Sequence, residues 1–548
     1  MRHTDDFTSY LGDLLDGVYD CTDRIALSAY FPLGQTSGGM LTWWNQLNPG
    51  APLTEERLRD FAGCFARRIR AFAQKHHIPF ECLGSGERKH DRAEQLRPAD
   101  PAFEGVFAIF VGQASALVWQ VRHNSKGQPL LSRPKNWRMV NHYYLHIIDR
   151  HWGHISVKIS GHPPFGASIS LNVHEWVQRQ AARHNIAWQR QANCFVAGSD
   201  YPAIEKIAAR LDAEAGLARL AKVCERWLYS ACLCFGLTRE QQQRSNFRYA
   251  YSCRQIEYSR NLLFHRGSVL DEVYQGMIER TRPALNLQTL KTIFGRKKRL
   301  FQNRADGAPM EKSVNTPAHD LTVFKLRFGG LMLKIYDKSE RVLRVEVVVL
   351  NIDELRCGRS VQKLPGMLGR LEAILTRFLC VVQAAHTGFL DGADPDALAA
   401  PTRKGKKRVA GVDLQKPRMK AVAEALVGLS PAPEGFSSAQ LAAQVKEQKG
   451  RELPDYNKRQ AAYDLRKLRG KKLVERMEGK RKYRVCIPQL HLMVGQLILK
   501  DKVIKPVLAG VCRASQGRAP NRASGTDQRY VKLRGQMHEL LQELRLIT

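Results

Sequence analysis

Histidine is concentrated in one short stretch of the chain, residues 142–158, whose alternating pattern is that of a β-hairpin. Side chains two apart on a strand lie on one face, so the polar residues that would share a face are His142, Tyr144, His146, His154, Ser156 and Lys158. Imidazoles beside a carboxylate such as Asp149, at the turn, can bind a divalent metal or move protons. The spacing matches no defined metal motif. A polar sheet face that contacts phosphate or sugar is therefore the favoured interpretation, with a metal site as the alternative.

A second group of residues that could do chemistry lies at 333–347. Strand alternation places Lys334, Tyr336 and Lys338 on one face, and Arg344 and Glu346 on one face of the next strand. If this cluster is catalytic, Tyr336 is the candidate nucleophile, and the candidate carboxylates are Asp149, Asp337 and Glu346. A structural ion pair of Glu346 with Arg344 or Lys334 is the favoured interpretation.

The pattern of helices and strands that must position these residues indicates an α+β multidomain protein. We expect a mixed body of helices and antiparallel sheet, followed by a C-terminal winged helix-turn-helix. At 548 residues, the usual domain size of about 100–200 residues gives three or four units. The predicted divisions are a mixed, partly helical region at 1–104, an α+β core at 105–390, a basic linker at 391–411, the winged helix at 412–486, and C-terminal helices with a mobile tail at 487–548. Within the core we predict strands in 105–171, helices in 173–293 (one of them over 253–262), strands in 321–350 and a long helix over 364–385.

Positive charge is concentrated between Arg403 and Arg484. This stretch holds 23 Lys/Arg and 9 Asp/Glu, a net of +14 out of the +34 of the whole chain. Such a charge density on a folded unit indicates a polyanionic partner.

Helix caps within this stretch predict three helices and a hairpin. The first helix covers 417–427, the second begins at Ser437 with a capping box to Gln440, and the third is capped by Asn457. Two strands then flank residues 478–480. Ala461, Ala462, Leu465 and Leu468 form the expected inward stripe of the third helix.

In helix-turn-helix proteins the second helix of the motif enters the major groove while flanking cations hold phosphates. The candidate base contacts are Gln460, Tyr463 and Arg466. The other candidate nucleic-acid contacts are Arg403, Lys404, Lys406, Lys407, Arg408, Lys458, Arg459, Lys467, Lys480, Arg481, Lys482 and Arg484, with a second basic run of Arg296, Lys297, Lys298 and Arg299.

Two resemblances extend this interpretation. The segment Lys334–Glu346 resembles, over about 15 residues, the hairpin of rolling-circle replication initiators of small plasmids and filamentous phages, which would imply tyrosine-dependent DNA cleavage. The chain lacks the His-hydrophobe-His metal motif of many of those enzymes. More widely, segments such as 143–155, 172–176 and 257–262 resemble an uncharacterised, often multi-copy bacterial protein family with a C-terminal winged helix. Multi-copy occurrence implies a gene carried by a mobile element.

The composition of the chain bears on the compartment in which we expect the protein. No run of about 20 apolar residues and no signal peptide are present, so we expect a cytoplasmic protein without a membrane partner. The 12 cysteines include no C-x-x-C pair and are expected to be reduced and mostly buried.

The sequence thus predicts a nucleic-acid-binding protein that acts on DNA through a winged helix and a basic linker. One alternative is an enzyme, either a metal-dependent nuclease or a tyrosine-type nicking and strand-transfer enzyme. The other is an RNA-binding component of a ribonucleoprotein, holding structured RNA. No cofactor is indicated beyond a divalent metal, and the oligomeric state stays open.

Overall fold

The computed structural model describes residues 5–274, 322–387 and 396–497, and short pieces between 528 and 539. Gaps inside these ranges fall at 85, 117, 124–128, 133–137, 192, 199, 213, 329, 405–406, 431, 433–434, 450–452, 480 and 487–492. The chain forms two compact units. One, the sheet unit, contains residues 16–263 and 330–372. The other, the second unit, contains residues 1–15, 264–329 and 373–548.

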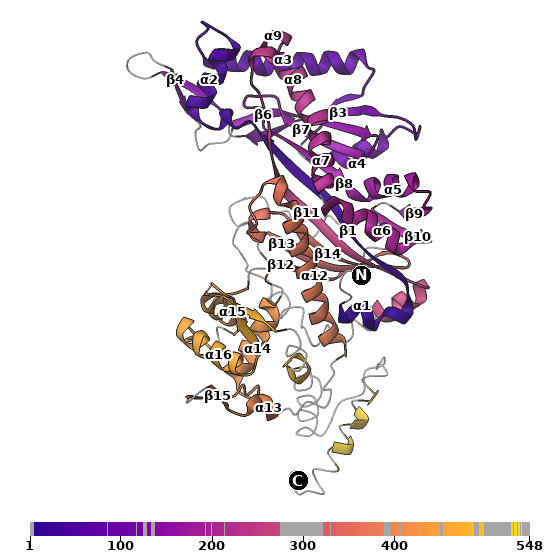
Figure 1. The fold of residues 1–548 in the computed structure, drawn as a ribbon, viewed down its shortest axis with the longest axis vertical. Helices are drawn as coiled ribbons and strands as arrows, with labels where there is room; N and C mark the ends of the chain where they lie inside the picture. Colours follow the sequence, from indigo (N-terminus) through magenta and orange to yellow (C-terminus); the bar gives the residue numbers. More distant parts are fainter. Residues whose placement is uncertain are drawn as a thin grey trace. The chain divides into compact units, whose positions relative to one another are not determined.

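A large mixed sheet forms the centre of the sheet unit (Figure 1). Its strands follow one another in the order β13 (Leu331–Ser339), β14 (Val342–Val349), β11 (Ala250–Phe264), β1 (Leu15–Tyr30), β8 (Ala167–Asn172), β7 (Gly153–Ser160), β6 (Arg138–Asp149), β3 (Gly105–Ala116) and β2 (Phe80–Cys82). The pairs β13–β14, β11–β14, β1–β8, β7–β8, β6–β7 and β3–β6 are antiparallel, and β2–β3 is parallel. This mixed sheet and its helices confirm the α+β class.

Helices and two small hairpins surround this sheet. They are α2 (Ser37–Leu47), α3 (Glu55–Lys75), α4 (Lys89–Gln95), α5 (Val173–Arg183), α6 (Tyr201–Ala208), α7 (Glu214–Val223), a π-helical turn (Cys224–Tyr229), α8 (Ser230–Gly236) and α9 (Arg239–Arg244), with the hairpins β4 (Gln120–His123)–β5 (Pro129–Ser132) and β9 (Trp188–Gln191)–β10 (Cys194–Gly198). Short 3-10 turns cover Leu33–Gln35, Ala209–Asp212, Ile352–Leu355 and Val361–Lys363.

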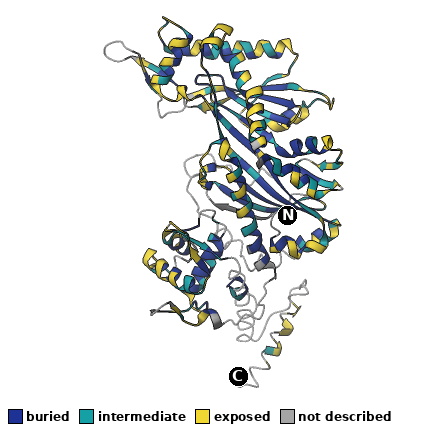
Figure 2. Cartoon of the chain, in the orientation of Figure 1, coloured by how far each residue is buried: buried dark blue, intermediate teal, exposed yellow. Residues whose placement is uncertain are grey.

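Helix α3 illustrates how these helices join the core. Thr54 caps α3 by accepting a hydrogen bond from the Arg57 amide, and the apolar stripe of α3 is buried. Phe65 in this stripe packs its ring on Phe165 and Phe235. The buried strands and the exposed outer faces of the helices are visible in Figure 2.

Two central strands differ from the sequence-based expectation. The predicted helix over 253–262 is wrong, because these residues belong to β11, which pairs with β14 over residues 256–263. The strand β1 was not predicted at all. Both strands have buried charged residues where alternation would place apolar ones, such as Asp20 on β1 and Arg260 on β11. Asp20 and Arg260 pair with each other at 2.7 Å, which satisfies both charges inside the sheet unit but hides the strand pattern in the sequence.

The second unit contains α1 (Asp6–Tyr10), a 3-10 turn (Gly12–Leu14), β12 (Thr322–Phe328), α13 (Asp396–Ala399), the hairpin β15 (Thr402–Lys404)–β16 (Lys407–Val409), α14 (Pro417–Leu429), α15 (Ser438–Lys449), α16 (Lys458–Gly470) and the hairpin β17 (Val474–Arg476)–β18 (Tyr483–Val485). The long helix α12 (Leu364–Thr387) contributes residues to both units. Of the C-terminal helices expected in 487–548, residues 493–497 are described and are helical. The end of the expected helical stretch 173–293, from residue 275 on, lies outside the described residues.

Residues 412–486, here called the C-terminal module, have one apolar core. Phe436, Leu441, Leu465 and Leu468 are all buried in it. Leu398 belongs to the same core, and its carbonyl accepts a hydrogen bond from the Val412 amide at 2.7 Å. Over its described residues, the segment predicted as an exposed linker is therefore a short helix and a hairpin that are attached to the module. Among the described helices, none is long and apolar enough to cross a membrane.

Candidate functional site

The third helix of the C-terminal module, α16, begins at a reciprocal cap. Asn457 accepts hydrogen bonds from the amides of Arg459 (3.0 Å) and Gln460 (3.2 Å), and the Gln460 side chain accepts one from the Asn457 amide at 3.0 Å. The predicted cap is confirmed. The side-chain oxygen of Gln460 is engaged in it, which leaves the Nε2 amide as the part of this predicted base contact that could reach a ligand.

A buried carboxylate fixes the orientation of α16. Asp464 is fully buried, accepts hydrogen bonds from Arg418 of α14 at 2.9 Å and from the Tyr456 hydroxyl at 3.0 Å, and lies 3.7 Å from Lys467. The expected inward stripe is thus corrected at one position. Asp464 lies inside and Ala462 is exposed, because residues 461, 464, 465 and 468 are the ones that share a helical face.

The outer face of α16 consists of residues spaced three or four apart, like those of its inner face. Arg459, Ala462, Tyr463 and Arg466 form this exposed stripe, and Lys458 is exposed beside it. Tyr463 is 45% exposed, with the Lys467 ammonium 4.8 Å from its ring centroid. The stripe therefore combines two guanidinium groups, an aromatic ring and a small residue that lets another surface approach the helix.

The hairpin β17–β18 adds cations to the module. It closes through a hydrogen bond from the Met477 amide to the Lys482 carbonyl at 2.9 Å, and Gly479 adopts a positive φ of 67° in its turn. Phe436 forms a third, single-residue strand, bonding Tyr483 in both directions at 2.7 and 2.8 Å. Arg476 and Arg481 are exposed, whereas Lys482 and Arg484 are half-buried.

The basic hairpin β15–β16 contacts α16. Its register pairs Arg403 with Arg408, and both of these arginines are exposed. The side chains of Lys404 and Lys407 and all of Lys406, Lys480 and 296–299 lie outside the described residues.

The predicted cluster at Tyr336 forms, with the geometry of a structural ion pair. Glu346 is buried, and its carboxylate lies 3.0 Å from the Lys334 ammonium and accepts a hydrogen bond from the Tyr336 hydroxyl at 3.3 Å. Burial raises the pKa of Tyr336 well above its usual value, which keeps the phenol protonated and weakly nucleophilic.

Arg344, which is opposite Tyr336 in the register, has its charged partner in the interior of the sheet unit. It is fully buried, donates to the Asn261 side chain at 2.8 Å, and lies 3.8 Å from Asp23. Asp23 also accepts a hydrogen bond from Ser259 at 2.8 Å and lies 3.3 Å from His174. Burial raises the pKa of Asp23 to about 7 despite the neighbouring Arg344 guanidinium. This network connects β1, β11, β14 and α5 and is a structural core of polar groups.

The candidate carboxylates do not form one site. Asp149 is buried at the β6–β7 turn, where it accepts hydrogen bonds from the Trp152 amide at 3.0 Å and the Trp227 indole at 2.7 Å. Six strand steps separate β6 from β13, about 29 Å at about 4.8 Å per step. Asp149 is therefore far from Tyr336 and from Asp337, which follows Tyr336 on β13 and pairs with Leu343 in register.

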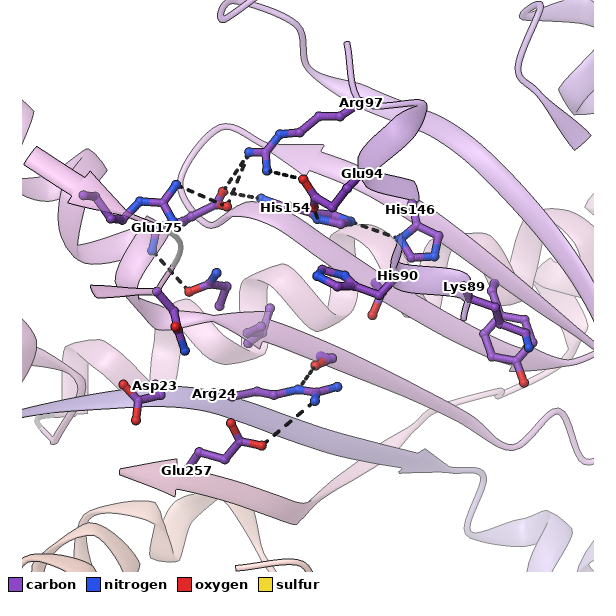
Figure 3. Close-up of a pocket in the computed structure, with 17 residues that line it drawn as sticks. Asp23, Arg24, Lys89, His90, Glu94, Arg97, His146, His154, Glu175 and Glu257 are labelled. Carbon is purple, nitrogen blue, oxygen red and sulfur yellow. Dashed lines mark hydrogen bonds and ion pairs between the residues drawn. The ribbon is translucent and has the colours of Figure 1, made fainter. Parts of the chain in front are cut away.

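The histidine-rich hairpin has the predicted register. Tyr144 pairs with Lys158 and His146 with Ser156, which places these residues and His154 on one face of the sheet. This face borders a cavity of about 770 Å³ (Figure 3). The polar residues that line the cavity are Asp23, Arg24, Lys89, His90, Glu94, Arg97, Tyr144, His146, His154, Ser156, Ser170, Asn172, Glu175, Arg190, Asn193 and Glu257.

Most of the cavity residues were missed from the sequence. Among them, His90 and Glu94 lie on α4, a helix that was not predicted. With Ala93 as its only fully buried residue, α4 has no apolar stripe to reveal it. The available signal was the spacing of His90 and Glu94, because residues four apart share one face of a helix.

Comparison of the chain with models of known protein families, with curated proteins and with solved structures gave no match.

Proposed function

We propose that this protein binds duplex DNA through its C-terminal module, which acts as a winged helix-turn-helix. The observation that carries the proposal is the outer face of α16, with Arg459, Tyr463 and Arg466 exposed on a helix whose inner face is fixed by Asp464. A helix with its side chains is about 10–12 Å across, and the major groove is about 12 Å wide.

The order of elements supports the same function. Three helices, a single-residue strand at Phe436 and a two-stranded hairpin match the arrangement in which a reading helix is flanked by a basic wing. The exposed cations Arg476 and Arg481 of the wing and Arg403 and Arg408 of the neighbouring hairpin are suited to phosphates.

The base-reading residues under this proposal are Arg466 and Tyr463, with Gln460 limited to its Nε2 amide by the helix cap. Ala462 lies on the same exposed stripe as Arg466 and Tyr463, and its small side chain allows the helix to enter the groove. The other cations position the helix without reading sequence.

The test uses the full chain, freed of nucleic acid at high salt, and fluorescence anisotropy with a short labelled duplex. Ala462→Glu places bulk and negative charge in the stripe without lowering helix propensity much, and should weaken binding at least tenfold, or about 1.4 kcal/mol. The matched control is Ala182→Glu, at an exposed alanine of α5 in the sheet unit, which should bind like the wild type.

Equal affinity of the wild type and Ala462→Glu would refute the role of α16. Competition with double-stranded RNA decides between the nucleic acids. If RNA displaces the DNA duplex at much lower concentration, the module belongs to an RNA-binding protein, and a single RNA species that copurifies with the chain would agree with that result.

A further inference from the structure

The cavity of the sheet unit contains three potential metal ligands that lie close together. One ligand atom each from His90, Glu94 and His154 fall within 4.8 Å of one another. Two of these residues come from α4 and one from the start of β7, so the group depends on the tertiary structure of this unit alone.

Local packing holds α4 where it presents its ligands. Ala93, between the two ligands in sequence, is fully buried in a small apolar cluster with Phe107 and Phe110 of β3. Arg92 pairs with Glu81 of β2 at 2.7 Å on another side of the helix. His90 and Glu94, four residues apart, therefore face the cavity together (Figure 3).

Both the backbone and the ring of His154 are fixed by contacts with neighbouring side chains. Its amide donates to Glu175 at 2.8 Å, while Gly153 before it has a positive φ of 68° and lies so close to Glu175 that a Cβ would be 2.0 Å from Oε2. The ring lies between Glu94, 2.9 Å from Nδ1, and His146, whose Nδ1 is 3.0 Å from Nε2. The ring position is thus set by the fold.

His146 provides a second observation that points to a ligand. It is 3% exposed, borders the cavity, and its Nε2 has no hydrogen-bond partner among the described residues. His146 Nδ1 lies 3.0 Å from Nε2 of His154, so the other nitrogen of His154, Nδ1, is the one that faces Glu94 and can bind an ion beside that carboxylate. Such outer hydrogen bonds are typical of metal-binding histidines.

We infer that His90, Glu94 and His154 bind one divalent transition-metal ion, Zn²⁺ in preference to Mg²⁺ or Ca²⁺, with His146 as the positioning residue for His154. Two imidazoles and one carboxylate are a ligand set found in open zinc sites, whereas Mg²⁺ and Ca²⁺ favour oxygen ligands. The Glu94–His154 contact of 2.9 Å is a few tenths of an ångström shorter than the roughly 3.3 Å that separates two ligand atoms bonded at about 2.0–2.1 Å to one tetrahedral ion.

The surroundings of the three ligands are polar. The Glu94 carboxylate also accepts a hydrogen bond from Arg97 at 3.3 Å, and the His90 ring stacks on the His154 ring with 5.7 Å between the ring centroids. The remaining coordination positions face the cavity, where Arg97 and Arg190 are placed to attract an anionic ligand.

The experiment measures Zn²⁺ binding to the full, reduced chain by calorimetry and by metal analysis after dialysis. The variants His90→Ala and Glu94→Gln alter exposed ligands, so folding should be retained, as circular dichroism can verify. Each should lose one bound equivalent, with affinity lowered at least about 100-fold, since even outer-shell changes cost about 10–100-fold. His184→Ala, an exposed histidine of the same unit outside the cavity, should bind Zn²⁺ like the wild type.

A second readout replaces Zn²⁺ with Co²⁺, whose visible absorption reports nitrogen and oxygen ligands directly. The wild type and His184→Ala should show the same bands, and His90→Ala should lose them. Excess Mg²⁺ or Ca²⁺ should not displace the ion. The inference is overturned if the wild type takes up no ion at micromolar Zn²⁺, or if both ligand variants retain the full equivalent, which would mean adventitious binding only.

Discussion

Salt dependence offers the sharpest test of the DNA interface. Arg459 and Arg466 on α16 and Arg481 on the β17–β18 hairpin are exposed and lie on elements proposed to face the duplex. Replacing all three with glutamine removes three positive charges while keeping long polar side chains and, on α16, good helix propensity.

The magnitude follows from counterion release. Each phosphate that a protein cation neutralises contributes about 0.9 to the slope of log affinity against log salt on duplex DNA. The triple variant should therefore have a slope shallower than that of the wild type by about 2.7. Between about 50 and about 200 mM salt, its affinity should fall about 40-fold less than the affinity of the wild type.

The control is a second triple variant, in which Arg59, Arg239 and Arg244 are replaced with glutamine. These three arginines are exposed on α3 and α9 of the sheet unit, and their replacement changes the net charge by the same amount. Anisotropy titrations at several salt concentrations give the slopes directly. The reasoning is refuted if the slope of the first variant equals that of the wild type, or if the control variant loses as much slope.

Three further outcomes are expected. Asp464→Ala should destabilise α16 by about 2–3 kcal/mol, since it leaves the partly exposed Arg418 guanidinium and the hydroxyl of the buried Tyr456 without their acceptor. Asp464→Asn should destabilise it by less. Hydrogen exchange of the α16 amides measures both effects, and unchanged exchange would contradict the role of Asp464. Burial lowers the pKa of His146 to about 3, so its contribution to stability is complete above about pH 6.5 and falls as the pH drops toward 3. Between pH 6.5 and pH 4, the free energy of unfolding of the wild type should therefore fall by about 3 kcal/mol more than that of His146→Asn. Tryptophan fluorescence during urea unfolding reports this unit, because all eight tryptophans lie between residues 43 and 227, and parallel pH profiles would be inconsistent with a buried neutral ring. Tyr336→Phe should leave DNA affinity unchanged, because the Tyr336 hydroxyl donates its hydrogen bond to Glu346. A protein–DNA adduct that depends on Tyr336 would contradict this structural role.

Elements whose signals are local were predicted well from the sequence. The caps at Ser437 and Asn457 fixed where α15 and α16 begin, because a cap depends on a side chain and amides within three residues. The partly helical character of region 1–104 was also predicted, since its longest helix, α3, buries only one face and so keeps the helical period.

Two strands of the sheet were missed or misassigned. Strands β1 and β11 have charged residues in the interior, and such residues are tolerated only because a partner from a distant part of the chain lies opposite, as Arg260 does for Asp20. No local pattern contains that partner. The same reason explains why Asp23, 321 residues away in sequence, was not expected as a partner of Arg344.

The sequence by itself determined the positive charge of the C-terminal module, its helix starts, and the shared face of His146 and His154, since all of these depend on composition or on neighbours along the chain. Only the tertiary structure decided that Asp464 lies inside and Ala462 outside, and that His90 and Glu94 approach His154. Those contacts require α4 and α16 to be packed against elements far away in sequence, and packing against distant elements is set by the burial of a whole core.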